Sequence, residues 1–320
     1  MEQRKEKKFV VLFPGQGSQS VGMGYDSKED ETVSYFLKRA DEVLNFPLSS
    51  LMFSGPEEEL TLTENAQPAI FTLSYALFQV MKREFSKNGK ELKNFCVSAG
   101  HSLGEYTAVS CAGAISFEDA LQVVRFRGKF MQEAVPKGEG AMVAILSNLE
   151  VIQEIIKNKE NVWISNINSE NQIVLSGKKS AVDTICEEMK EKKIKFIPLK
   201  VSAPFHCPLM EKAKEKLSKV MEKISENGFD FPVISAHTLE FYTKEKLKET
   251  LLYGIVAPVN FLGCIKKLHS MGFDTFVEVG PGKVLSSLVK RIIPSSKAIS
   301  INSVKDAIEF AREFFAEISR

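Results

Sequence analysis

The sequence predicts an α/β fold with a mostly parallel sheet and a smaller inserted module, and three observations support this. Short apolar strands alternate with amphipathic helices along most of the 320 residues. The strand predicted at 95–99 leads through Gly-His-Ser-Leu-Gly, residues 100–104, into a helix. Residues 141–200 follow the order β-α-β-β-α-β, which is typical of a ferredoxin-like module.

The composition excludes several classes of protein. With 42 basic and 41 acidic residues the net charge is +1, which argues against a nucleic-acid or membrane-surface partner. The five cysteines are odd in number and include no C-x-x-C pair, which predicts reduced thiols in a cytoplasmic protein and neither disulfides nor a zinc site. Residues 1–8 lack the apolar core of a secretory signal, and residues 66–81 are too polar to span a membrane.

The first 136 residues are predicted to begin the larger domain. A strand at 8–13 runs into the loop 14–19, Pro-Gly-Gln-Gly-Ser-Gln, whose glycines let backbone N–H groups approach a ligand. This loop lacks the pattern of a phosphate-binding P-loop. Helices are predicted at 35–44, 67–84, 103–112 and 117–135.

The inserted module is predicted to follow a linker at 136–140. Its strands are expected at 141–146, 162–166, 172–176 and 195–200, and its helices at 149–157 and 180–190. We therefore expect a ferredoxin-like subdomain at 137–200 within a larger domain formed by 1–136 and 201–320.

The chain is predicted to return to the larger domain through residues 201–210. Two prolines fix an irregular path there and hold His206 on a loop. Beyond it, a strand-like run lies at 231–235 and a core strand at 273–279. Helices are predicted at 211–226, at 244–253, up to residue 271, and at 283–292.

Ser102 occupies the position of a nucleophile elbow, the sharp strand-to-helix turn of some serine enzymes. Such a turn strains the serine backbone, and its neighbours Gly100 and Gly104 lack side chains that would collide there. The turn exposes the hydroxyl and directs the unpaired N–H groups of the following helix toward the reacting atom. The alternative is a plain Gly/Ser turn.

Arg127 lies on the apolar stripe of the helix at 117–135, between Val124 and Met131, whereas Arg125 and Lys129 are expected to face solvent. A guanidinium keeps its proton and is rarely buried without an anion. Arg127 therefore needs a carboxylate, and the helix pattern leaves open whether it is internal or belongs to a ligand.

A serine nucleophile needs a base, and the chain has four histidines. His101 adjoins Ser102, and neighbouring side chains diverge on a sharp turn. His269 lies on a lysine-rich helix and is expected at the surface. His206 is preferred to His237 because it lies on a loop at the domain junction.

The remaining parts of the site are less distinct in the sequence. Asp274 and Glu278 on the last predicted strand are candidates to orient the histidine, and a backbone carbonyl would serve equally well. The N–H of Leu103 and an N–H of the loop at Gln16 are the expected donors to an oxyanion.

Taken together, these features resemble the malonyl-CoA:acyl-carrier-protein transacylases of fatty acid synthesis. The likeness extends over about residues 9–299. The matching blocks are FPGQGSQ at 13–19, TENAQPA at 63–69, GHSLGE at 100–105, RFRG at 125–128, SAPFH at 202–206 and EVGPG at 278–282.

The resemblance implies a role for each matching residue. Ser102 would carry the malonyl group as an ester, with His206 as general base. The amides of Gln16 and Leu103 would bind the oxyanion, and Arg127 would bind the malonyl carboxylate in a bidentate pair.

It also implies a supporting set of residues. The backbone carbonyl of Asn260 would orient the histidine. Phe205 is typical of members that use malonyl rather than branched groups. The match departs at 235–237, where relatives commonly have an asparagine, so the role of His237 stays open. The pocket would be lined by Gln67, His101, Asn168 and Phe205.

The resemblance further implies an α/β-hydrolase-like core with a ferredoxin-like insertion, and a ping-pong transfer from malonyl-CoA to acyl carrier protein without a cofactor. We expect a monomer. Lys283, Lys290 and Arg291 are candidates to dock an acidic carrier protein, or form a solvated basic face. The alternatives are a trans-acting polyketide acyltransferase, a serine thioesterase or other hydrolase, which Arg127 disfavours, and an inactive docking module.

Overall fold

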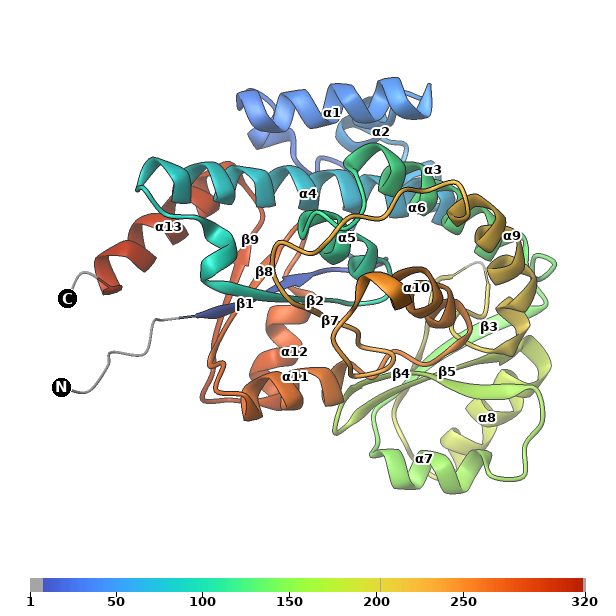
Figure 1. Cartoon of the computed structure of the whole chain (residues 1–320). Helices are drawn as coiled ribbons and strands as arrows, with labels where there is room; N and C mark the ends of the chain where they lie inside the picture. Colours follow the sequence, from blue (N-terminus) through green and yellow to red (C-terminus); the bar gives the residue numbers. More distant parts are fainter. Residues whose placement is uncertain (1–7, 202, 319–320) are drawn as a thin grey trace.

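Two sheets organise the chain in the computed structural model, which describes residues 8–201 and 203–318 (Figure 1). Sheet A has five strands in the order β7-β2-β1-β8-β9, and each neighbouring pair is parallel. Sheet B has four strands in the order β4-β5-β3-β6, and each pair is antiparallel. The predicted α/β class with a mostly parallel main sheet is confirmed.

The elements around sheet A come from both ends of the chain. The strands are β1 (Phe9–Phe13), β2 (Cys96–Gly100), β7 (Val233–Ile234), β8 (Thr275–Val279) and β9 (Lys297–Ile301). The helices are α1 (Glu31–Leu44), α2 (Leu48–Ser54), α3 (Glu57–Thr61), α4 (Thr63–Lys87), α5 (Leu103–Cys111), α6 (Phe117–Glu133), α9 (Glu211–Met221), α10 (Leu247–Val256), α11 (Phe261–Ser270), α12 (Val284–Ile292) and α13 (Val304–Ile318).

Sheet A is buried on both faces, as β1 illustrates. Successive side chains of a strand point to opposite faces, so Phe9, Val11 and Phe13 join one apolar core while Val10 and Leu12 join another. Helices α4, α5, α6 and α13 cover the first face, and α11 and α12 cover the second (Figure 1).

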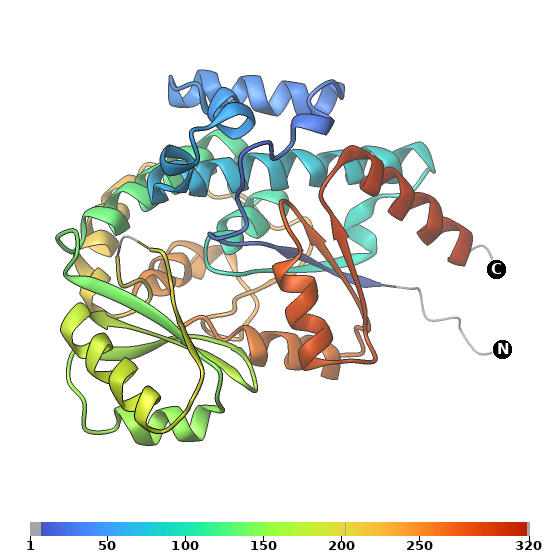
Figure 2. The same ribbon diagram turned by 180° about the vertical axis from the view of Figure 1, so that it is seen from behind.

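Sheet B consists of β3 (Gly140–Ile145), β4 (Val162–Ser169), β5 (Gln172–Lys178) and β6 (Phe196–Pro198). Helices α7 (Leu149–Ile156) and α8 (Lys179–Glu191) pack on its outer face, which Figure 2 shows at the lower left. Three residues of the inner face, Met142, Ala144 and Val174, join the main core and line a cavity described below.

A proline inside α4 frees a backbone carbonyl that accepts a hydrogen bond from α6. Pro68 has no N–H, so it cannot bond to the carbonyl of Glu64 four residues earlier. Arg125 of α6 donates to that carbonyl instead, at 2.7 Å, and also to the side chain of Asn65. The expectation that Arg125 faces solvent is therefore wrong, and its side chain is only 25% exposed.

Several element boundaries differ from the predictions. Helix α4 begins at Thr63 rather than 67, α9 ends at Met221 rather than 226, and β6 is shorter than the strand expected at 195–200. No element was predicted beyond residue 292, where the structure has β9 and α13. Strand β9 is an edge strand with partly exposed side chains, so its apolar pattern is weak.

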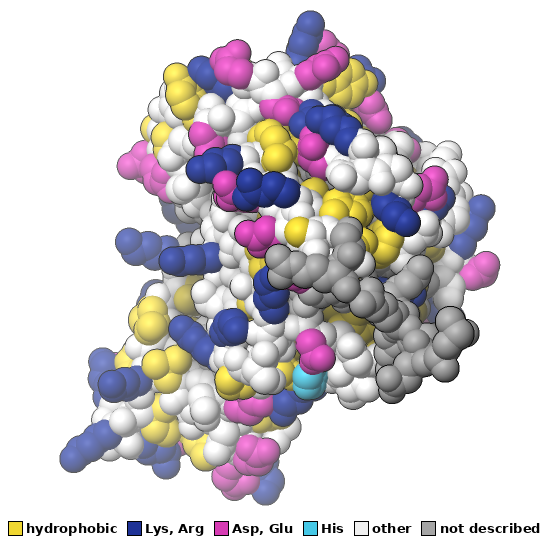
Figure 3. Space-filling view, turned by 90° about the vertical axis from the view of Figure 1, so that its left-hand side faces the viewer, with side chains coloured by type: hydrophobic (Ala, Val, Ile, Leu, Met, Phe, Trp, Pro, Cys, Tyr) yellow, Lys and Arg dark blue, Asp and Glu magenta, His cyan; other side chains and the backbone are white. Residues whose placement is uncertain are grey.

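Figure 3 shows the side of the molecule that lies at the left in Figure 1, where Lys and Arg side chains are interspersed with Asp and Glu side chains. Within 8–201 and 203–318, no helix is long and apolar enough to cross a bilayer.

Candidate active site

Ser102 lies at the turn between β2 and α5 with φ 55° and ψ −106°, a backbone region unusual for a residue with a side chain. Two glycines permit this turn. A Cβ on Gly100 would lie 1.9 Å from the carbonyl carbon of Gly104, and a Cβ on Gly104 would lie 2.0 Å from the carbonyl oxygen of Phe13. The turn therefore requires glycine at both positions.

His206 is hydrogen-bonded to the hydroxyl group of Ser102. The distance from Ser102 Oγ to His206 Nε2 is 2.8 Å, and His206 Nδ1 is 2.8 Å from the carbonyl oxygen of Gly254. A carbonyl can only accept, so Nδ1 carries the proton and Nε2 accepts from the Ser102 hydroxyl. Burial, followed by repulsion from His237 and Arg127, holds the pKa of His206 well below its usual value, so the imidazole is neutral.

The group that orients His206 differs from the expectation. It is the carbonyl of Gly254 and not that of Asn260, whose side chain instead accepts an N–H bond of 2.9 Å at the start of α11. The two acidic candidates lie elsewhere: Glu278 accepts the first amides of α12, and Asp274 Oδ1 lies 2.9 Å from Nδ1 of His269. A carbonyl partner leaves no mark in the residue type, so the sequence did not indicate Gly254.

Arg127 reaches the same serine from α6. Its side chain is buried, with Nη1 donating to Gln67 Oε1 at 2.8 Å and Nη2 donating to Ser102 Oγ at 3.0 Å. The Tyr106 ring lies beneath the guanidinium, 5.1 Å from Cζ. Among the described residues no carboxylate lies within ion-pair distance, and Arg127 Nε has no partner. Within the described residues, Arg127 therefore does not form the internal ion pair that was one of the two possibilities from the sequence.

These side chains open onto a cavity of about 550 Å³ between sheet A and sheet B. His101 Nε2 is 2.9 Å from Asn168 Oδ1, which extends from the end of β4 and so brings the second sheet into the wall. The predicted residues that line the cavity are Gln16, Gln67, His101, Ser102, Arg127, Asn168, Phe205 and His206.

Of the two predicted oxyanion donors, Leu103 follows Ser102 directly in the chain and Gln16 lines the same cavity as Ser102. Leu103 is the first residue of α5, and Gln16 lies on the loop after β1, where its side chain donates to Thr63. In the ranges that the structure describes, neither backbone N–H has a hydrogen-bond acceptor. Both amides therefore remain able to bind a ligand oxygen.

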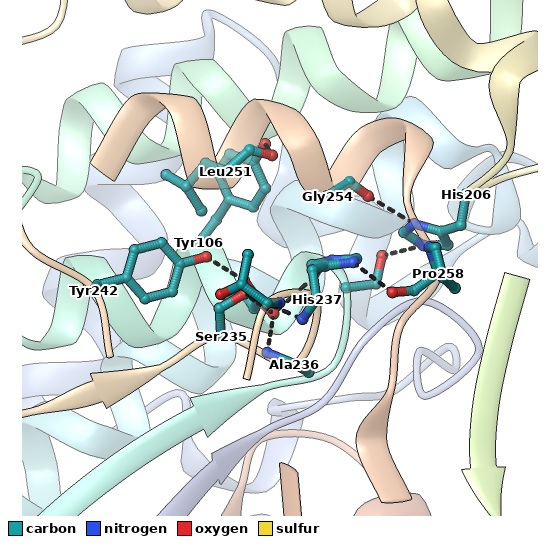
Figure 4. A network of polar contacts seen from close by, with 12 residues as sticks. Tyr106, His206, Ser235, Ala236, His237, Tyr242, Leu251, Gly254 and Pro258 are labelled. Carbon is teal, nitrogen blue, oxygen red and sulfur yellow. Dashed lines mark hydrogen bonds and ion pairs between the residues drawn. The ribbon is translucent and has the colours of Figure 1, made fainter. Parts of the chain in front are cut away.

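A buried carboxylate behind the site was not anticipated. Glu105, in the first turn of α5, accepts from the Ala236 N–H at 2.6 Å, from the Ser235 hydroxyl at 3.1 Å and from the Tyr242 hydroxyl. Figure 4 labels these three partners. Burial raises the pKa of Glu105 to about 7, and these hydrogen bonds oppose the rise. An acidic residue within the apolar helix at 103–112 was the sequence signal for it.

Two of the three basic candidates lie beside the cavity. Exposed Lys283 and Arg291 line a groove with Gln172, and this groove shares Gln172 with the lining of the cavity. Lys290 instead donates to the carbonyl of Ser296. Elsewhere in the described ranges, no group of three or more His, Cys, Asp or Glu side chains is arranged to hold a metal ion.

Comparisons with known proteins agree over nearly the whole chain. The model of the acyl transferase domain family matches residues 10–312. A malonyl CoA-acyl carrier protein transacylase of Bacillus subtilis is 44% identical over 318 residues, covering 97% of this chain and 98% of the relative.

Solved structures give the same result. A malonyl CoA-acyl carrier protein transacylase of Coxiella burnetii superposes with a TM-score of 0.91 at 35% identity, covering 97% of this chain and 98% of that one. A malonyl-transacylase in complex with a holo type II PKS acyl-carrier protein superposes with a TM-score of 0.89 at 36% identity, covering 96% of this chain and 100% of that one.

Proposed function

The chain belongs to the acyl transferase domain family, and we propose that it transfers the malonyl group of malonyl-CoA to the phosphopantetheine thiol of an acyl carrier protein, supplying fatty acid synthesis. One observation supports this most strongly. The buried guanidinium of Arg127 lies 3.0 Å from the Ser102 hydroxyl and has no carboxylate partner in the described ranges. An acyl group that ends in a carboxylate supplies the missing anion.

The first half of the reaction forms a malonyl ester on Ser102. Its oxygen attacks the thioester carbonyl carbon while its proton passes to His206 Nε2, 2.8 Å away. The tetrahedral intermediate then collapses, the carbon–sulfur bond breaks, and the CoA sulfur takes the proton from the imidazolium. CoA leaves, and His206 is neutral again.

The second half reverses these roles. His206 takes the proton of the phosphopantetheine thiol, and the sulfur attacks the carbonyl carbon of malonyl-Ser102. The serine oxygen leaves and recovers the proton from the imidazolium. One histidine thus serves both halves of a ping-pong reaction, so no cofactor is required.

The oxyanion of both intermediates is assigned to the amides of Gln16 and Leu103. Gln16 lines the same cavity as Ser102, and Leu103 is the first residue of α5, where the helix dipole adds to the attraction for a negative charge. Losing one such donor typically costs about 3 to 4 kcal/mol of transition-state stabilisation.

The same geometry disfavours a hydrolase. A thioesterase or lipase acts on a neutral acyl chain, which offers no anion to Arg127. The polyketide alternative is supported by one relative, whose structure contains a type II PKS acyl-carrier protein. The two pathways share the malonyl transfer and differ in the carrier, so the preferred carrier distinguishes them.

The remaining features extend the proposal. We propose that residues 1–136 and 201–320 form an α/β-hydrolase-like domain and that 137–200 form a ferredoxin-like insertion, which the strand order of sheet B supports. The acidic carrier would dock over Lys283 and Arg291 beside the cavity mouth. We propose a cytoplasmic monomer, and all five cysteines are free thiols.

Transfer to carrier protein tests the function. The protein is mixed with malonyl-CoA and a holo-carrier, and the malonyl-carrier product is measured by mass spectrometry. We expect rapid formation with the wild type and none with Ser102→Ala or with apo-carrier, which lacks the thiol. Product formation by Ser102→Ala at the wild-type rate would contradict the proposal.

A further inference from the structure

We propose that His237 is a positioning residue for His206, because its imidazole ring fixes the position of the Gly254 carbonyl that orients the base. This inference rests on the proposed function, in which His206 is the general base. His206 and His237 have ring centroids 5.5 Å apart, and His206 Nδ1 bonds to Gly254. His237 therefore acts on the base through another residue.

The ring of His237 packs directly on Gly254. A Cβ placed on Gly254 would lie 2.6 Å from both Cδ2 and Nε2 of the ring, closer than any real contact of this kind. The imidazole therefore fills the space that a side chain at 254 would take. The glycine carbonyl lies where the ring allows it, near the end of α10.

His237 also contacts the segment that follows the end of α10. Its Nδ1 donates to the carbonyl oxygen of Pro258 at 3.0 Å, and its side chain is only 2% exposed. One ring thus contacts Gly254 before the end of α10 and Pro258 after it. Figure 4 shows Gly254 and Pro258 on the side of His237 nearer to His206.

A buried network holds His237 from behind. Its backbone N–H donates to Ser235 Oγ at 3.1 Å, and the Ser235 hydroxyl donates to Glu105 Oε2 at the same distance. The carboxylate also accepts the N–H of Ala236. His237 Nε2 lies 3.8 Å from Glu105 Oε1, longer than a hydrogen bond, so the backbone of the turn is the main support. These contacts connect Glu105 of α5, the helix that follows Ser102, through the turn at 235–237 to the carbonyl of Gly254.

Single-turnover malonylation of Ser102 tests the role of the ring. In His237→Ala the carbonyl loses its support, and we expect the maximal acylation rate to fall by about tenfold to a hundredfold, as for a small misplacement of a reacting group. The apparent KM for malonyl-CoA should stay within about threefold, because His237 does not line the cavity. His237→Asn keeps an N–H donor near the place of Nδ1 but lacks the ring atoms that contact Gly254, so it should recover only part of the rate.

The matched control is His269→Ala. The Nδ1 of His269 also lies near a backbone carbonyl, that of Phe273 at 3.3 Å, but that carbonyl does not orient His206. We expect its rate to equal that of the wild type. If His237→Ala or His237→Asn matches the wild-type rate, the proposal is overturned.

A double substitution tests the link through Gly254. In Gly254→Ala the new methyl group would collide with the ring, so we expect a loss similar to that of His237→Ala. Removing the ring makes room for the methyl group, so the combined variant should lose less than the product of the two single effects. Multiplicative losses would overturn the proposal, even if one single variant proves unstable in a thermal melt. Absence of a malonyl-Ser102 adduct in the wild type would instead refute the proposed function.

Discussion

Replacing Arg127 by methionine is expected to abolish the preference for malonyl groups. The guanidinium lies 3.0 Å from Ser102 Oγ, so a carboxylate bound there is buried with it. Leaving one partner of a buried, hydrogen-bonded charge pair alone costs about 2 to 5 kcal/mol. That corresponds to a loss of about 30-fold to 4,000-fold in the malonylation rate. Acetyl groups lack the carboxylate, so their transfer should not fall in this way.

The same substitution is expected to leave the fold intact. Arg127 is 2% exposed and Nε has no partner, so burial of its charge is poorly compensated in the free protein. Methionine has a similar volume and no charge, and replacing buried charges by apolar side chains is neutral or stabilising by about 1 to 4 kcal/mol. This gain is offset by leaving the buried Gln67 Oε1 without its donor, which costs about 1 to 3 kcal/mol. We therefore expect the free energy of unfolding in urea to stay close to that of the wild type.

The assay is single-turnover acylation with malonyl-CoA or acetyl-CoA, read by intact-protein mass spectrometry. The control is Arg125→Met on the same helix, which frees the Glu64 carbonyl bonded at 2.7 Å. It should lower stability by about 1 to 3 kcal/mol and keep the malonyl preference. A retained malonyl preference in Arg127→Met, or a loss of stability as large as that of Arg125→Met, would contradict the role assigned to Arg127.

Two further predictions concern the elbow and the carboxylate behind it. Gly104→Ala places a methyl group 2.0 Å from the Phe13 carbonyl oxygen, so we expect a loss of about 3 kcal/mol or more in urea unfolding, and wild-type stability would contradict this. Glu105 has a pKa of about 7 in the fold against 4.5 as its ordinary value, so the folded state binds its proton more tightly. Its contribution to stability should therefore fall by on the order of 3 kcal/mol as the pH rises from 4.5 to 7. The difference in unfolding free energy between the wild type and Glu105→Gln measures this, and a difference that stays constant or grows with pH would contradict it.

The sequence indicated the reacting groups because each depends on a local pattern. Two glycines around Ser102 predicted the turn, and prolines beside His206 predicted a loop. The helical period predicted that Arg127 is buried, and the structure places its guanidinium next to the serine. Each of these patterns can be recognised from residues that lie close in sequence to the reacting group.

What the sequence did not indicate depends on contacts between distant segments. The carbonyl of Gly254 and the ring of His237 come together only when α10 packs beside the turn after β7. Arg125 is partly buried because Pro68 frees a carbonyl on another helix. Any residue type can offer a backbone carbonyl, such as those of Gly254 and Glu64, as an acceptor. A single sequence therefore does not indicate which carbonyl a distant side chain will use.

The most direct test of the proposed acyl transfer is the mass of the intact protein after mixing with malonyl-CoA alone. We expect one malonyl ester per chain, mapped to the peptide that contains Ser102, with one equivalent of CoA released and no further turnover until a carrier thiol is added. Continuous release of CoA and free malonate without a stable adduct on Ser102 would contradict it.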